Sequence, residues 1–139
     1  MNSISNLANT DTINAKISLA LESAVLQTKH ICLNIDEYVN YSQKISFAQI
    51  IDQLTLVVDF LIVLKGYINQ IQEIKKIQEF CDTLHDTLVS LVTTSQKHDS
   101  IMTRDILENE LKFNLLKIEA FFIHYNGVIK HQDSPKRKI

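Results

Sequence analysis

Apolar residues recur at steps of three and four through the first part of the chain, which is the spacing of one face of an α-helix. From near Thr12, this apolar face comprises Ile13, Ile17, Ala20, Ala24, Ile31, Ile35 and Tyr38, with Leu21, Val25 and Cys32 at its edge. Asp11 or Thr12 can accept the first unpaired backbone N–H bonds, so the pattern predicts an amphipathic helix of roughly 25 residues. Residues 1–11 lack this periodicity and are expected to form a mobile segment.

The second predicted helix, about residues 47–67, has the best-marked start. Ser46 and Gln49 have the spacing of a capping box, in which the serine hydroxyl accepts a backbone N–H bond and the glutamine reaches back. The helix is apolar around most of its circumference, which predicts that other helices pack on two or three of its sides. Burying an unpaired carboxylate is costly, so we expect Asp59 on the narrow exposed strip, or else paired with a lysine or a hydroxyl.

A turn is predicted at residues 66–70, although the spacing of Tyr67, Ile71 and Ile74 would also allow the helix to continue. The third helix should end by Thr94, and its narrow apolar seam consists of Ile74, Ile77, Cys81, Leu84, Leu88 and Leu91. The polar run 93–100 is typical of a loop, with helix caps available at Asp99, Ser100 and Thr103. We therefore predict an all-α antiparallel bundle of four or five helices.

The last helix carries more apolar surface than one core contact requires. Its first apolar stripe is Leu107, Leu111, Leu115, Ile118, Phe122 and Tyr125. Its second stripe is Ile106, Phe113, Leu116, Ala120 and Ile123. In a bundle one stripe fills the core, and the other must be covered by the N-terminal segment, by a second copy or by a client, unless it is core as well. Asn126 and Gly127 suit a left-handed helix stop.

Length and composition agree with a single helical domain. A chain of 139 residues can form one core, and two glycines with one proline are too few for a fold rich in tight turns. We place the bundle at residues 12–126. Residues 127–139 are basic, with Lys130, Lys136, Arg137 and Lys138, and we expect a disordered tail there.

Charge and cysteine usage favour a cytoplasmic protein. A net charge of −2 gives no general attraction to nucleic acid or to anionic membranes. The longest apolar run, residues 54–64, is shorter than the roughly 20 residues that span a bilayer. Residues 1–12 do not have the pattern of a signal peptide, and Cys32 and Cys81 stand among apolar residues as reduced thiols would.

Candidate chemistry is sparse, so we expect neither an enzyme nor a metal or cofactor site. The chain lacks a glycine-rich phosphate loop. Asp82 and His85 have the spacing of a helical metal site, with Asp86 adjacent, but a di-iron bundle needs a second such motif and further inward carboxylates. Cys81 shares a helix face with His85, and a thiol in the predicted core stays protonated.

The order of elements resembles the family of flagellin-specific export chaperones called FliS. Thr10-Asp11-Thr12 followed by residues 19–25 is similar to that family's capped opening helix, and residues 98–111 resemble the acidic entry to its last helix. The overlay covers most of residues 10–125. The chain departs from the pattern in having Ile13 where the family has a proline and Leu21 where it has an aromatic residue.

This resemblance implies a cytoplasmic export chaperone, or a co-chaperone that pairs with FliS. Such a protein holds an amphipathic helix of an export substrate in an apolar groove. The second stripe of the last helix, Ile106, Phe113, Leu116, Ala120 and Ile123, is the candidate groove wall. The alternative is a stand-alone adaptor, immunity-type or structural bundle that covers this stripe itself or forms a homodimer.

Overall fold

The computed structural model describes residues 2–41 and 46–133, with the side chains of 12–40 and 46–131. All elements in these ranges are helical. They are α1 (Asn2–Tyr41), α2 (Phe47–Lys65), α3 (Ile71–Gln96), α4 (Ser100–Asp105), the π-helix η1 (Ile106–Leu111) and α5 (Lys112–Asp133). Because α4, η1 and α5 follow one another without a break, the described chain forms four helical rods. The predicted all-α bundle is confirmed.

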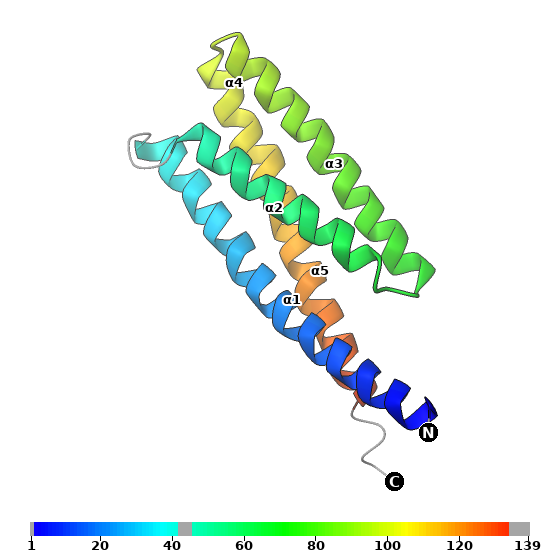
Figure 1. The fold of residues 1–139 in the computed structure, drawn as a ribbon. Coiled ribbons are helices and arrows are strands. Elements are labelled where there is room, and N and C mark those ends of the chain that lie inside the picture. The colour runs from blue at the N-terminus through cyan, green and yellow to red at the C-terminus, as the bar shows by residue number, and fades with distance from the viewer. Residues whose placement is uncertain (1, 42–45, 134–139) are drawn as a thin grey trace.

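The rods are arranged in a ring in which each contacts its neighbours in the chain, and the last rod closes back on the first (Figure 1). α1 and α5 run side by side and make the most extensive contact, while α2 and α3 cover one side of this pair. The common core lies between the four rods. Its largest fully buried side chains include Phe122, Leu21, Ile31, Ile35, Ile50, Leu54, Leu61, Ile77, Leu84, Leu91, Leu107 and Leu111.

α1 begins at Asn2, so the predicted start near Thr12 is wrong. Residues 2–11 contain neither glycine nor proline, and extending an existing helix costs far less than nucleating a new one. The side chains of residues 1–11 lie outside the described part, so the predicted mobility of this segment stays a prediction.

α5 runs through Asn126 and Gly127 to Asp133, so the predicted stop and the bundle boundary at 126 are also wrong. Ile129 is 3% exposed and lies four residues after the buried Tyr125, on the same helix face. Burying such a side chain stabilises by about 1.5–3 kcal/mol, which outweighs the roughly 1 kcal/mol that a glycine costs inside a helix. Of the predicted basic tail, residues 134–139 lie outside the described part.

α2 begins as its sequence predicts. The backbone N–H of Gln49 donates to Ser46 Oγ at 3.1 Å, and the backbone N–H of Ser46 donates to Gln49 Oε1 at 2.8 Å. The predicted turn at residues 66–70 is confirmed, since α2 ends at Lys65 and α3 begins at Ile71.

α1 and α3 both pack against α2, as expected for two of its sides, but its outer side is not covered by another rod. Its inward face is buried, but its outer face leaves Leu56, Ile62 and Val63 exposed, because no other rod covers that side. Asp59 lies on this exposed side, as predicted. Among the described residues, α2 is also the one helix long and apolar enough to cross a membrane by length and composition, although core helices of soluble bundles pass the same test.

The π-helix η1 changes which side of the last rod faces the core. Hydrogen bonds from residue i to i+5 bring residues five positions apart onto one side of a helix. Ile106 and Leu111 are both buried as a result, together with Leu107. A regular α-helix would have turned Ile106 toward the second stripe, where the sequence pattern placed it.

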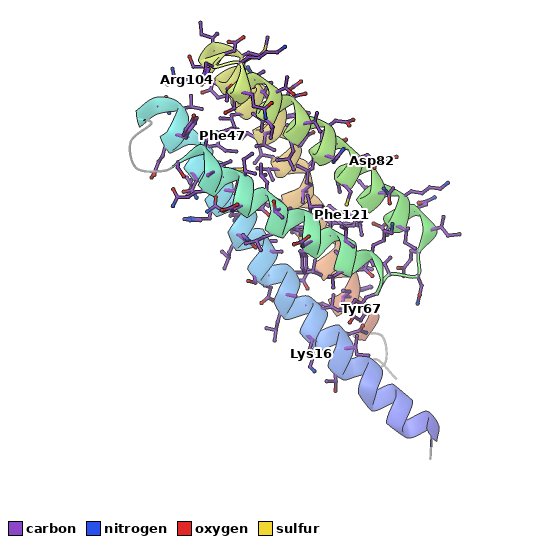
Figure 2. The ribbon with its side chains drawn as sticks, turned by 45° about the horizontal axis from the view of Figure 1, so that its top comes forward. Lys16, Phe47, Tyr67, Asp82, Arg104 and Phe121 are labelled. Carbon is purple, nitrogen blue, oxygen red and sulfur yellow. The ribbon has the colours of Figure 1, made fainter. Side chains whose placement is uncertain are left out.

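The turn before α4 is fixed by side-chain caps. Asp99 accepts a hydrogen bond from the backbone N–H of Met102 at 3.0 Å, as one of the three predicted caps, and Thr103 Oγ1 donates to Thr94 Oγ1 at 2.9 Å. His98 takes a positive φ of 55° there, which turns the chain out of α3. At the same end of the bundle, Arg104 donates to the backbone carbonyl of Val39, tying α4 to α1 (Figure 2).

Replacing Gly127 with alanine should stabilise the protein. Its φ is negative, and a Cβ added there would meet nothing within 4 Å. The substitution removes the entropic cost of glycine in a helix, so we expect the free energy of unfolding to rise by about 0.5–1 kcal/mol in urea titrations followed by circular dichroism. Gly66→Ala is the matched control, because a Cβ there would lie 3.3 Å from the Val63 carbonyl oxygen. This variant should raise the free energy of unfolding by less than Gly127→Ala does. A loss of stability for Gly127→Ala would contradict this account of α5.

Candidate protein-binding surface

Polar side chains fix the register between α1 and α5. Three ion pairs connect described residues of the two helices: Glu22 with Lys130 at 2.9 Å, Asp36 with Lys112 at 2.7 Å, and Lys29 with Glu119 at 3.7 Å. Ser18 Oγ also donates to Asn126 Oδ1 at 2.6 Å. We call these contacts the polar ladder. They lie on the outer side of the pair, away from the core.

Hydrogen bonds within the polar ladder shift the pKa of two of its members. The hydrogen bond to Asp36 raises the pKa of Lys112, and the hydrogen bond from Lys130 lowers the pKa of Glu22. Both shifts favour the charged forms that make the ion pairs. Glu22 and Lys112 are therefore charged at neutral pH.

α3 and α5 pack less closely than α1 and α5 do. They approach each other near α4 and diverge toward the connection between α2 and α3 (Figure 1). The divergence leaves an open groove of about 530 Å³ lined by Lys76, Phe80, Lys117, Ala120, Phe121 and His124. We call it the α3–α5 groove. Its volume lies within the range of ligand and peptide-anchor sites.

The floor of the α3–α5 groove is aromatic and rigid. The rings of Phe80 and Phe121 meet edge-to-face with their centroids 5.5 Å apart, and Phe121 stacks on Tyr125 at 6.0 Å. Figure 2 shows Phe121 in the middle of the bundle. Burial raises the pKa of Tyr125, so its hydroxyl stays neutral beside this floor. The groove thus offers fixed rings below and the charged ends of Lys76 and Lys117 at its edges.

The structure separates the five residues predicted for the groove wall. Ile106 is 6% exposed and belongs to the core because of the π-helix, so it cannot contribute to a surface. Ala120 lines the α3–α5 groove, and Phe113, 56% exposed, has the ammonium of Lys117 at 4.4 Å from its ring centroid. The wall therefore keeps Ala120 inside the groove and Phe113 at its edge.

Leu116 and Ile123 are exposed and lie between the polar ladder and the α3–α5 groove, since each is three or four residues from Ala120 and from the ladder. Each lies three or four residues from Lys112, Glu119 or Asn126, the α5 members of the polar ladder, and residues so spaced share one side of a helix. These two side chains therefore face outward beside α1 and do not line the α3–α5 groove.

α1 also carries an exposed row of leucines that the sequence pattern did not predict. Leu19, Leu26 and Leu33 are seven residues apart and all are exposed, although the predicted apolar face of this helix lies elsewhere. Each stands three or four residues from Glu22, Lys29 or Asp36, so the row borders the polar ladder on its α1 side. Their seven-residue spacing was the available signal.

A smaller hollow of about 330 Å³ opens where α1 passes the end of α2, near Lys16 and Tyr67 (Figure 2). It is lined by Ile13, Lys16, Ile17, Ala20, Val63 and Tyr67. Its single cation and its smaller size make it a weaker candidate than the α3–α5 groove.

The possible metal and thiol sites do not assemble. His85 and Asp82 are exposed, Asp82 accepts a hydrogen bond from Gln78, and no cluster of three His, Cys, Asp or Glu side chains within the described part could hold a metal ion. Burial raises the pKa of Cys32 to about 11 and also raises that of Cys81, which is half-buried and not fully in the core as its seam position suggested. Both thiols are protonated at neutral pH.

Comparison with known proteins adds no relative: neither a protein-family model, nor a curated protein, nor a solved structure matches the chain. The function must therefore be argued from the surface itself.

We expect Cys32 to resist alkylation at pH 8 in the folded protein, because its buried thiol ionises far above that pH. Mass spectrometry after iodoacetamide treatment should show modification of Cys81 before Cys32, and modification of both in urea. Stability should also fall as the pH rises from 9 toward 11, since the unfolded chain releases the Cys32 proton there and the folded chain retains it. Faster labelling of Cys32 than of Cys81 would contradict this assignment.

Proposed function

We propose that this protein binds an amphipathic helix of another protein in the α3–α5 groove and holds it without altering it chemically. The observation that carries the proposal is an open groove with an aromatic floor and a lysine from each of its two helices, Lys76 from α3 and Lys117 from α5. A helix laid in such a groove buries its apolar side chains on the floor while its backbone remains internally hydrogen-bonded.

The groove chemistry indicates what the bound helix carries. Phe80, Ala120 and Phe121 favour aliphatic or aromatic anchors spaced by one helical turn. Lys76 and Lys117 favour acidic side chains beside those anchors. The ligand is thus an acidic amphipathic helix, which would otherwise expose its apolar face to water.

More specifically, we propose a cytoplasmic flagellar export chaperone or co-chaperone. The resemblance of residues 10–125 to the FliS family supports this assignment, and a helix-holding groove is the device that such a role requires. The partner is then an export substrate of the flagellin kind, kept soluble before secretion, or FliS itself.

Binding should be tested with purified protein and labelled peptides from the terminal helices of flagellar export substrates, and with purified FliS. Fluorescence anisotropy should show saturable binding that weakens as salt increases, because the lysine contacts are screened. Lys117→Glu should weaken binding at least tenfold by reversing one side of the groove. Lys75→Glu is the matched control, because Lys75 is exposed on α3 and does not line the groove.

Filling the groove tests the same proposal without changing its lysines. Ala120→Arg should abolish binding, whereas Ala48→Arg, at an exposed alanine of α2, should leave it unchanged. Circular dichroism must show unchanged helix content in both variants. If neither the peptides nor FliS bind the folded protein at low salt, the export role is wrong.

A stand-alone bundle that self-associates is the second candidate. It is favoured by the leucine row on α1, which lies outside the α3–α5 groove. Self-association and helix binding use different surfaces and can coexist.

A further inference from the structure

The outer side of the α1–α5 pair carries aliphatic side chains on both helices. Leu19, Leu26 and Leu33 border the polar ladder on α1, and Leu116 and Ile123 border it on α5. α1 and α5 run antiparallel, so residues at the same height along the two helices have numbers with a constant sum. The ion pairs Lys29–Glu119 and Asp36–Lys112 set this sum at 148. Leu26 therefore lies nearly level with Ile123, and Leu33 nearly level with Leu116. Together these five side chains form a strip that the described part of the chain leaves uncovered, which we call the outer strip.

We infer that a second copy of this chain covers the outer strip, with the two α1 helices packed antiparallel about a twofold axis at Leu26. In this arrangement Leu26 meets Leu26 of the second copy, and Leu19 meets Leu33 of the second copy on both sides of the axis. The row is thus complementary to itself, as a twofold interface requires.

The charges beside the leucine row select the antiparallel orientation. The leucines occupy one position of a seven-residue repeat, and the neighbouring position four residues later holds Ser23, His30 and Glu37, with Lys16 one repeat earlier. In a parallel in-register pair the two opposite edges of the row would face each other, which would place Asp36 beside Glu37 of the second copy. The antiparallel pair places Lys16 beside Glu37 of the second copy, and both side chains are exposed.

The charged residues on the opposite edge of the leucine row, three positions after each leucine, also favour the antiparallel orientation. Glu22 of one copy lies beside Lys29 of the other when the axis passes through Leu26. Each of these two side chains already belongs to the polar ladder, so the dimer extends the intramolecular ion pairs of α1 and α5 across the axis. Both edges of the row therefore match a second copy in charge as well as in shape.

The length of the contact suits a stable dimer. From Lys16 to Glu37 α1 extends about 30 Å, and Leu116 and Ile123 of each copy flank this line. An isolated exposed leucine is ordinary, but an apolar strip of this length on a soluble protein marks an interaction surface. None of the five side chains of the outer strip lines the α3–α5 groove.

The oligomeric state of the full chain tests the inference. Sedimentation equilibrium should show a dimer, and Leu26→Glu should raise its dissociation constant at least about a hundredfold, because two carboxylates would meet at the axis. Leu56→Glu is the matched control: Leu56, 55% exposed against 67% for Leu26, lies on α2 outside the strip, and this variant should remain dimeric. Circular dichroism should show full helix content in both.

Charge exchange and cross-linking test the orientation. Lys16→Glu should weaken the dimer, and adding Glu37→Lys should restore it. In a background with Cys32→Ala and Cys81→Ala, a mixture of Leu19→Cys and Leu33→Cys proteins should form mixed disulfide dimers, whereas Leu19→Cys alone should not.

A wild-type monomer at all concentrations that stay soluble would overturn the inference. So would a dimer that Leu26→Glu leaves intact, or efficient cross-linking of Leu19→Cys with itself. These outcomes are separable from the fate of the proposed function. Helix binding by a Leu26→Glu monomer supports the groove alone, and a dimer that binds no helix supports the outer strip alone.

Discussion

The pairing of the first and last long helices is the constraint on which the rest of the structure depends. Ion pairs at a protein surface add little to stability, so the polar ladder sets the register of α1 and α5 more than their stability. The stability comes from the apolar rows behind it. Since α2 and α3 cover only one side of the pair, the ladder and the aliphatic side chains beside it stay at the surface.

The π-helix makes this pairing compatible with a well-filled core at the α4 end. It brings Ile106, Leu107 and Leu111 inward together, where a regular helix would bury two of them and leave the first at the side. After Lys112 the rod is a regular α-helix, and its outer face keeps Phe113, Leu116 and Ile123 exposed.

Much of the fold follows from local chemistry. Features that depend on neighbouring residues and on helical spacing are predicted correctly from the sequence. They are the capping box at Ser46, the cap at Asp99, the turn after Lys65 and the core stripe of the last helix. The burial of Ile106 required an i→i+5 turn that spacing rules do not contain. The continuation of α5 past Gly127 depended on α1 offering a surface for Ile129.

The candidate site was harder to predict because it depends on which rods meet. Only part of the anticipated wall, Ala120 with Phe113 beside it, reaches the α3–α5 groove, since the divergence of α3 from α5 decides where the hollow lies. Phe80 and Phe121 read as ordinary core residues until their rings are seen to form its floor. The leucine row on α1 was not predicted, because the sequence of a helix with two apolar faces does not indicate which face the other helices cover.

The closure of the ring by α1 and α5 also has a consequence for folding. The hydrogen bond between Ser18 and Asn126 spans 108 residues, whereas most helical bundles are rich in local contacts and fold rapidly for that reason. During synthesis α1 leaves the ribosome long before α5 exists, so Leu21, Ile31 and Ile35 have only α2 to cover them at first. This protein therefore completes its core only after α5 has been made, and until then it is itself a chain with an unprotected amphipathic helix.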